Sequence, residues 1–306
     1  MTPHADAVAN PGSAAARRAR ARAEAEYFLN RNVRGGYRDP AKGEKCWGVV
    51  ESLRGVRLSS GEPFGTRLDA FRSGRVLVPC CGVGGLEFVV RDRLGVAVDA
   101  FDLDERLLSE AREGRSVEGI RQFVADANDV ELAPDRYDLI LVINAAHHVE
   151  DLEHFFGALN RSLRPQGVLV GHEYVGENRI GYFPPNLELI RRVWAIIPDE
   201  YKHPECRPAY RLPDPARLSP NEGVRCREIP RIARETLRIV HERRSGAVDW
   251  PLFQRLLLPS AEAGADPARV RESRILADFI RLLESMVMER GILDGHGMTF
   301  LAEKRA

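Results

Sequence analysis

RVLVPCCGVGGLEF, residues 75–88, is the stretch that decides the fold of this chain. Three apolar residues run into Pro79, two adjacent cysteines follow, and a run of glycines then opens an apolar helix. A strand that ends in such a glycine-rich turn lets backbone N–H groups approach a ligand closely. We therefore expect a buried strand over 75–80, a ligand-binding turn and a helix over 84–94.

The chain continues as a regular alternation of strands and helices. Further strands are expected over 96–102, 120–126, 137–145, 167–175, 237–244 and 298–305. The helices expected beside them cover 104–113, 151–163, 228–236 and 267–290. Such alternation predicts an α/β fold in which helices cover both faces of a mostly parallel, seven-stranded sheet, with ligands at the carboxyl ends of its strands.

Composition divides the chain into five parts around this alternation. The first 24 residues offer little apolar surface to bury, and the insertion after the fifth strand is rich in proline and aromatic residues. The five parts are a disordered tail over 1–24, a helical lid segment over 25–74, the ligand-binding core over 75–177, an insertion over 178–227 that forms a lid over the site, and the completion of the sheet over 228–306.

Charge and composition argue against several classes of protein. Of 306 residues, 45 are basic and 45 acidic, so electrostatic attraction to nucleic acid or to an anionic membrane is not expected. No apolar run reaches the roughly 18 residues of a membrane span, and the N-terminal stretch lacks the apolar core of a secretory signal, so we expect a cytoplasmic protein. Five cysteines, an odd number without a repeated CxxC spacing, predict neither disulfides nor a zinc site, and we expect no metal.

The glycine turn is open to three interpretations. A phosphate-binding loop of the Gly-Lys-Ser/Thr type needs a lysine, which the turn lacks. A dinucleotide fingerprint, GxGxxG, is incomplete, because the turn offers Gly82-Val83-Gly84 and then Leu86 and Glu87. The third interpretation rests on a resemblance that extends well beyond the turn.

That resemblance is to the class I methyltransferases that use S-adenosylmethionine (SAM). VLVPCCGVG resembles the motif usually written VLDLGCGTG in that superfamily, with Cys81, Gly82 and Gly84 in matching places. AFDLDERLLSEAR resembles the family's GVDISPEMLELAR, Asp126-Ala127-Asn128 resembles its GDAEDLP segment, and Leu163-Arg164-Pro165-Gln166-Gly167 stands where Leu-Lys-Pro-Gly-Gly is usual. Two positions depart from the pattern, because Val78 stands where an acid is usual and Cys80 replaces the first glycine.

The resemblance implies a Rossmann-like class I methyltransferase fold that binds SAM on the loops after its strands. Asp102 would accept both ribose hydroxyls, and Asp126 would meet the adenine amino group. Cys80 would have to adopt a turn conformation that glycine enters more easily. The residues carried over as cofactor-binding are Cys80, Cys81, Gly82, Gly84, Asp102, Leu103, Asp126, Ala127 and Asn144.

Two residues near strand ends are candidates for catalysis. Methyl transfer to an alcohol, a phenol or an activated carbon needs a base, and His148 after the fourth strand is one candidate. The alternative is that His147 and His148 only begin the next helix. Glu173, at the end of the fifth strand, is a second candidate for taking a proton or holding the acceptor, and its alternative is a salt bridge with Arg179.

Aromatic residues and a charged segment of the insertion leave further alternatives open. Trp47, Trp194 and the tyrosines between 182 and 210 would either wall an apolar pocket or form the core of the insertion. The segment 219–229 could fold over the cleft, with Arg225 paired either with an anionic substrate or with a glutamate.

Together these features predict a SAM-dependent methyltransferase that moves a methyl group to an O, N or C atom of a small organic molecule. We expect bacterial secondary metabolism as its setting and a homodimer as one assembly. The alternatives are a protein that binds SAM or its product without transferring a methyl group, and a nicotinamide-dependent oxidoreductase.

Overall fold

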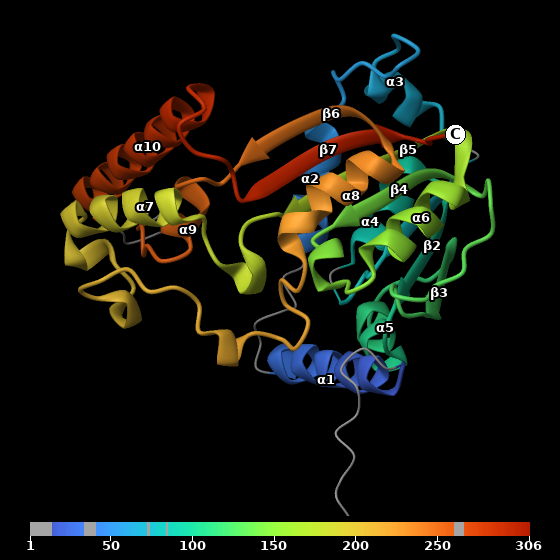
Figure 1. The fold of residues 1–306 in the computed structure, drawn as a ribbon, viewed down its shortest axis with the longest axis horizontal. Coiled ribbons are helices and arrows are strands. Elements are labelled where there is room, and N and C mark those ends of the chain that lie inside the picture. Colours follow the sequence, from blue (N-terminus) through green and yellow to red (C-terminus); the bar gives the residue numbers. More distant parts are fainter. Residues whose placement is uncertain (1–13, 34–40, 72–73, 84, 260–265) are drawn as a thin grey trace, which may run out of the picture.

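The computed structural model describes residues 14–33, 41–71, 74–83, 85–259 and 266–306, which form a seven-stranded sheet of order β3-β2-β1-β4-β5-β7-β6 (Figure 1). The strands are β1 (Arg75–Pro79), β2 (Ala97–Asp102), β3 (Ile120–Val124), β4 (Tyr137–Ile143), β5 (Leu163–Tyr174), β6 (Arg238–Ser245) and β7 (Gly297–Glu303). Neighbours pair in parallel, except that β7 runs antiparallel to both β5 and β6. The predicted α/β fold with a mostly parallel, seven-stranded sheet is confirmed.

Both faces of the sheet are covered by helices. Because successive strand residues point to opposite faces, Val76 and Val78 of β1 face one core while Leu77 faces the other. The first core is closed by α2 (Lys42–Ser52), α3 (Phe64–Asp69) and α4 (Leu86–Leu94), and the second by α6 (Leu152–Ser162) and α8 (Ile229–Thr236). The sheet is therefore the middle layer, and its strand ends are the surface left for a ligand.

The N-terminal segment is more ordered than the sequence predicts. Residues 14–24, expected to lie in a disordered tail, belong to α1 (Ala14–Val33), while residues 1–13 lie outside the described part of the chain. Alanine, arginine and glutamate are strong helix formers, and Ala25 packs with Val83 and with Leu107 of α5 (Glu105–Arg112). The prediction was wrong because it weighed the low apolar content and not the helix propensity.

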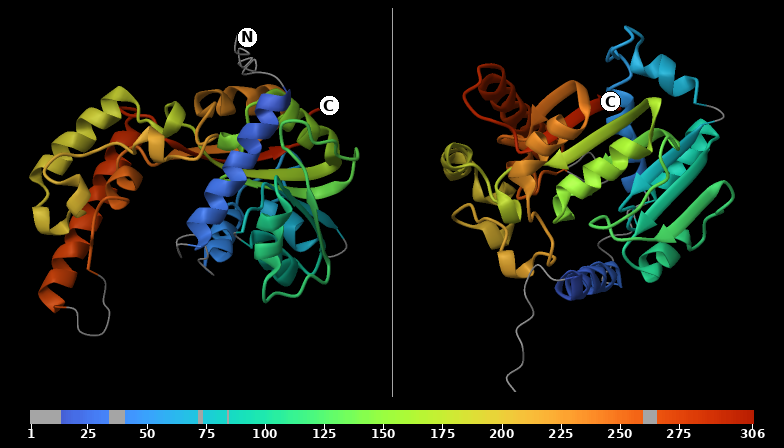
Figure 2. Two further views of the ribbon diagram at one scale, coloured as in Figure 1. Left: turned by 90° about the horizontal axis from the view of Figure 1, so that it is seen from below. Right: turned by 45° about the vertical axis from the view of Figure 1, so that its right-hand side comes forward.

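The insertion forms a separate apolar cluster beside the sheet. Its helix α7 (Pro184–Ile196) lies with α9 (Asp249–Phe253) and α10 (Pro267–Glu289) beyond the ends of β6 and β7, to one side of the remaining strands (Figure 1, Figure 2). The cluster includes Trp194 and the tyrosines Tyr182, Tyr201 and Tyr210, and Trp47 is buried in the core against the sheet. These aromatic residues are therefore core residues, and the predicted lid over 178–227 reaches the binding site only near residue 221.

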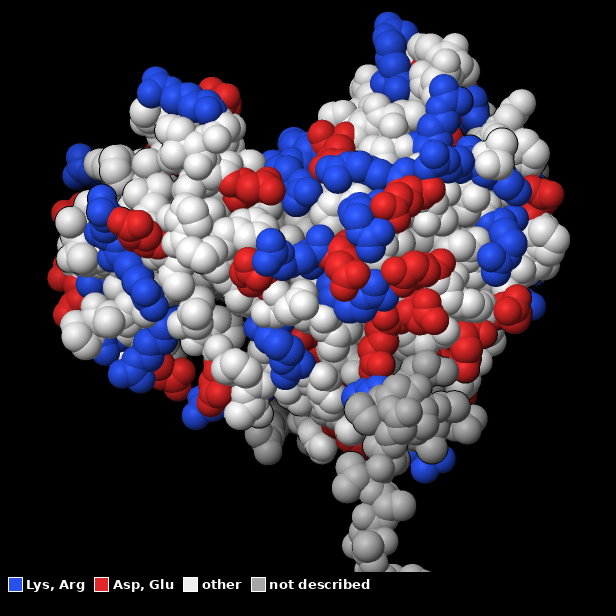
Figure 3. Space-filling view, viewed as in Figure 1, with Lys and Arg blue, Asp and Glu red and all other residues white. Residues whose placement is uncertain are grey.

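Arginine and glutamate side chains pair with one another on the surface. Basic and acidic groups alternate over the middle of the face shown in Figure 3, where α6, α8 and β6 lie. Arg225 pairs with Glu153 and Glu228, and Arg234 pairs with Glu242. Of the two alternatives for Arg225, the bridge to glutamate is the one that the structure shows. No described helix is both long enough and apolar enough to cross a membrane.

Candidate functional site

A cavity opens at the carboxyl ends of β1, β2 and β4, and the space free of atoms within it is about 1110 Å³, open solvent included. The predicted cofactor residues that line it are Cys80, Cys81, Gly82, Asp102, Leu103, Asp126, Ala127 and Asn144. The ninth, Gly84, lies outside the described residues. The structure thus brings together residues that are up to 64 positions apart in sequence (80 to 144).

The turn after β1 adopts the left-handed backbone that the glycine-rich sequence indicates. Cys80 has a φ of 49°, and Gly82 and Gly85 have φ values of 53° and 74°. The left-handed conformation costs a residue with a Cβ roughly 1–2 kcal/mol relative to glycine. Cys80 therefore carries this strain at the position where the family pattern has glycine. At Gly85 a Cβ would also lie 2.3 Å from an Arg115 guanidinium nitrogen, so the flexible Arg115 side chain would have to shift.

The two adjacent cysteines lie where burial disfavours the thiolate form. Burial raises the pKa of both the Cys80 and the Cys81 thiol well above the usual range, and the Asp102 carboxylate raises both further. A thiol with such a pKa stays protonated near neutral pH. Their small side chains instead leave room for the backbone of the turn to approach a ligand.

Asp102 is held rigidly at the end of β2. The Gly82 N–H donates to its Oδ2 at 2.7 Å, and the Leu103 N–H donates to its Oδ1 at 2.8 Å. Burial raises the pKa of Asp102, although these two backbone bonds oppose the shift. A carboxylate oxygen has two lone pairs, so each oxygen keeps one acceptor position beyond its backbone bond. Asp102 therefore presents a fixed pair of acceptors at the cavity.

Asp126 and Asn128 organise the loop after β3. Asp126 Oδ1 accepts from the Asn128 backbone N–H at 2.9 Å and from its side-chain amide at 2.7 Å. Asn128 Oδ1 in turn accepts from the backbone N–H groups of Glu150 and Asp151. The loop after β3 is thereby tied to the start of α6, which fixes the far wall of the cavity.

Glu173 lies beneath the turn after β4 and not on the cavity wall. Its Oε1 accepts from the backbone N–H groups of Ala145 and Ala146 at 2.7 and 2.8 Å, and its Oε2 lies 2.8 Å from His147 Nδ1. The alternative bridge to Arg179 is not formed, because the Arg179 guanidinium donates to carbonyl oxygens between Pro215 and Glu222. In the structure Glu173 positions the turn that carries both histidines.

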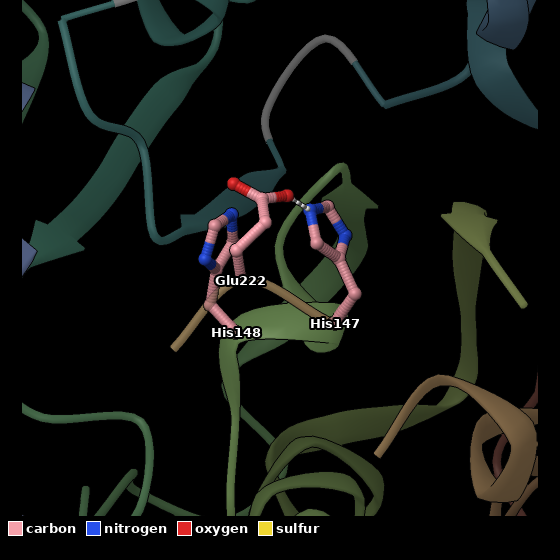
Figure 4. A group of neighbouring side chains, drawn as sticks. All are labelled: His147, His148 and Glu222. Carbon is pink, nitrogen blue, oxygen red and sulfur yellow. Dashed lines mark ion pairs between the residues drawn. The ribbon is translucent and has the colours of Figure 1, made fainter. Parts of the chain in front are cut away.

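His147 joins Glu173 to the end of the insertion. Its Nε2 lies 3.4 Å from Glu222 Oε1. Figure 4 shows the Glu222 carboxylate between the rings of His147 and His148. Burial lowers the pKa of His147, but the carboxylates of Glu173 and Glu222 outweigh it and raise this pKa to about 10. Burial raises the pKa of Glu222, but the two histidines lower it to about 2.

His148 is the predicted catalytic residue that the structure places on the cavity wall. Its Nδ1 lies 2.9 Å from Glu24 Oε1, which is close enough for an ion pair. The two groups are not aligned for a hydrogen bond. Glu24 is 2% exposed and also accepts from the Ser219 hydroxyl and the Asn221 N–H. Through Glu24, helix α1 is joined to residues 219–221 beside His148.

The cavity residues contributed by the N-terminal helices and by residue 221 were not predicted from the sequence. These are Glu24, Phe28, Lys42, Cys46 and Asn221. The expected lid over 25–74 and 178–227 includes the last four only as part of a long segment, and Glu24 lies in the segment 1–24 that was expected to be disordered. Glu24 stands in an alanine- and arginine-rich stretch, where a single acid gives no pattern that marks it as buried.

The described sheet has the strand order of a Rossmann-like, class I methyltransferase fold, with β7 antiparallel to its neighbours. The cavity at its strand ends lies where ligands bind in such folds. Residues 77–171 match the family model described as a methyltransferase domain. The match begins within β1 and ends within β5.

Several known proteins are similar to this chain in sequence or in fold. A malonyl-[acyl-carrier protein] O-methyltransferase of Enterobacter lignolyticus (strain SCF1) is 33% identical over 148 residues, which are 48% of this chain and 54% of the relative. The chain therefore matches about half the length of that curated relative. A putative sarcosine dimethylglycine methyltransferase from Galdieria sulphuraria has a TM-score of 0.49 at 15% identity, covering 92% of this chain and 98% of its own. Geranyl diphosphate C-methyltransferase from Streptomyces coelicolor A3(2) has a TM-score of 0.47 at 14% identity, covering 86% and 77%.

Proposed function

We propose that this chain is a SAM-dependent methyltransferase that transfers a methyl group to an O, N or C atom of a small organic molecule. The observation that carries the proposal is the cavity, which is lined by eight of the nine residues predicted to bind the cofactor. Those eight were chosen from four separate motifs, and a common wall is the arrangement that cofactor binding requires.

The residues present fit SAM. Asp102 would take the two ribose hydroxyls, since both of its oxygens keep an acceptor position and are fixed by backbone bonds. Asp126 would receive the adenine amino group, and the backbone of residues 80–82 would approach the methionine portion. SAM supplies an electrophilic methyl group on a sulfonium, so the protein has mainly to align the acceptor with it.

His148 is the residue that we propose as the general base. It lies on the cavity wall, and the Glu24 carboxylate beside it would stabilise the imidazolium formed when a proton is taken from the acceptor. Glu173, the other predicted catalytic residue, is proposed as a positioning residue because it contacts the turn and His147 and does not line the cavity.

Residues from α1, α2 and the end of the insertion would form the acceptor side of the cavity. Phe28 packs edge-on against His148, with ring centroids 5.7 Å apart, and Cys46 adds apolar surface. Lys42 and Asn221 add polar groups to the same wall. A mixed wall of this kind suits a small molecule with an apolar body and few polar groups.

Helix α10 supports the proposal of a homodimer. It exposes Ile275, Phe279, Leu282 and Met286 by 63%, 49%, 60% and 42%, in the 4-3-4 spacing of a coiled-coil seam. Two copies of this stripe paired antiparallel would cover it in a two-fold interface. Light scattering during gel filtration should give twice the mass of the chain, and Phe279→Asp should give a monomer. A monomeric wild type at micromolar concentration would contradict the dimer.

We propose a cytoplasmic location because the cysteine thiols are free. The cysteines Cys46, Cys80, Cys81, Cys206 and Cys226 are all unpaired in the structure. Unpaired thiols are usual in a reducing compartment.

The test of the proposed function is transfer of a labelled methyl group from SAM to small-molecule acceptors. The chain should produce S-adenosylhomocysteine (SAH) only in the presence of an acceptor, and Asp102→Ala should abolish the reaction. Tight SAH binding without turnover on a broad acceptor panel would favour the alternative of a binding protein. Binding of NADH in place of SAH would favour the oxidoreductase.

A further inference from the structure

A cluster of ionisable side chains lies at the edge of the cofactor cavity. The atoms of His147, His148 and Glu222 that can bind a metal ion all lie within 4.8 Å of one another. They come from two distant segments, since the histidines form the turn after β4 and Glu222 ends the insertion (Figure 4). Glu24 joins them from α1, with Oε1 2.9 Å from His148 Nδ1.

His147 is held as metal-binding histidines usually are. Its Nδ1 lies 2.8 Å from the Glu173 carboxylate, and because a carboxylate accepts hydrogen bonds, Nδ1–H is the donor. The other ring nitrogen, Nε2, faces Glu222. Metal-bound histidines commonly donate their other ring N–H to a carboxylate, which fixes the ring and its tautomer. The Nε2 to Oε1 separation of 3.4 Å is long for a hydrogen bond. It matches the spacing of about 3.3–3.4 Å between two ligand atoms that lie about 2.0–2.1 Å from a tetrahedral ion.

Charge in this cluster is unbalanced. Three carboxylates, of Glu24, Glu173 and Glu222, face two imidazoles, and the first two are only 2% and 1% exposed. Buried carboxylates need a partner of opposite charge, and a divalent cation placed among them would provide it.

Two polar atoms in the cluster also lack a hydrogen-bond partner within the described part of the chain. One is His148 Nδ1, and the other is Oδ1 of Asn221, a residue that is 4% exposed and lines the cavity beside Glu24. A buried polar atom without a partner usually marks a missing water, ion or ligand.

We propose that His147, His148 and Glu222 form a binding site for one divalent transition-metal ion. Two imidazole nitrogens and one carboxylate oxygen, with a fourth position left open, are a donor set that suits Zn²⁺, and Glu173 would orient His147 from behind. Because His148 also lines the cavity, an oxygen atom of the acceptor would take the open position, and the general-base role proposed above for His148 would apply only to the metal-free chain. That last consequence rests on the methyltransferase function proposed above, whereas the metal site itself does not.

The experiment is a calorimetric titration of the tag-free, chelator-treated chain with ZnCl₂, with metal content measured after gel filtration. The wild type should bind one equivalent of zinc, and Glu222→Gln should weaken binding at least about tenfold, because even residues behind a metal ligand contribute 10–100-fold. Glu177→Gln, the same substitution at a glutamate that pairs with Arg227, is the matched control and should leave zinc binding unchanged.

A second variant and a second ligand make the result decisive. His148→Gln should also weaken zinc binding, and circular dichroism shows whether each variant is folded. Failure of the wild type to retain zinc, or equal affinity in the wild type and either folded variant, would overturn the site. A parallel titration with SAH separates the two proposals, because loss of zinc binding with SAH binding intact refutes only the metal site. Zinc binding without SAH binding refutes only the methyltransferase.

Discussion

Glu87 should make the stability of this protein depend on pH. It lies in the first turn of α4, directly after the glycine turn, and is fully buried. Burial raises the pKa of Glu87 from 4.5 to about 7, against the opposing effect of the Gln122 side chain, which donates to Oε1 at 2.9 Å. Its Oε2 has no hydrogen-bond partner among the described residues, so no bond at this oxygen stabilises the ionised form.

The sign and size of the effect follow from that pKa. Because the folded-state pKa lies above the unfolded value, the folded chain keeps a proton that the unfolded chain loses, so stability falls as the pH rises from 4.5 to about 7. A difference of about 2.5 pKa units corresponds to roughly 3 kcal/mol of unfolding free energy. Glu87→Gln keeps the oxygen that accepts from Gln122 and cannot ionise, so it should lose this dependence.

Urea denaturation at pH 5.5, 7 and 8.5 measures the effect. Between the lowest and the highest pH, the free energy of unfolding of Glu87→Gln should rise relative to that of the wild type by about 2 kcal/mol. Glu188→Gln, a change at an exposed glutamate of α7, is the control and should follow the wild type. Parallel pH curves for wild type and Glu87→Gln would refute the reasoning.

Three further predictions concern the site. Asp102→Ala would remove the two charge-assisted hydrogen bonds that we propose for the ribose and should weaken SAH binding about 100-fold or more. Asp104→Ala, at the N-cap of α5, should cost about 1 kcal/mol of stability and leave SAH affinity unchanged, and equal affinity losses in both variants would contradict the assignment. His148→Gln should lower turnover at least about 100-fold while SAH affinity stays within a few-fold, and full turnover would exclude His148 as the base. Glu173→Gln should lower the free energy of unfolding by about 1–3 kcal/mol, because the amide disturbs the contact with His147; an unchanged melting temperature would contradict its positioning role.

The sheet, and the grouping of the proposed cofactor residues at one cavity, could be predicted from the sequence because both follow from local patterns. Asp102 and Asp126 stand at strand ends, and parallel strands bring such ends together at one edge of the sheet. Even the cost of the departure at Cys80 could be foreseen, since the turn requires a positive φ whatever residue occupies it.

The acceptor side could not be predicted because its residues meet only through tertiary contacts. Glu24 and Asn221 are 197 positions apart (24 to 221), and neither lies in a periodic or motif-like stretch. Alternation along β5 predicts that His172 and Glu173 point to opposite faces of the sheet. It does not predict that the turn at Ala145 and Ala146 packs on the Glu173 carboxylate and donates two hydrogen bonds to it.

The central claim is that the cavity after β1, β2 and β4 binds SAM. The most direct measurement is a calorimetric titration of the purified wild type with SAH, with Asp102→Ala and NADH as the two comparisons. We predict one SAH per chain with micromolar affinity, loss of that binding in Asp102→Ala, and no heat with NADH. No binding of SAH by the folded wild type would contradict the claim.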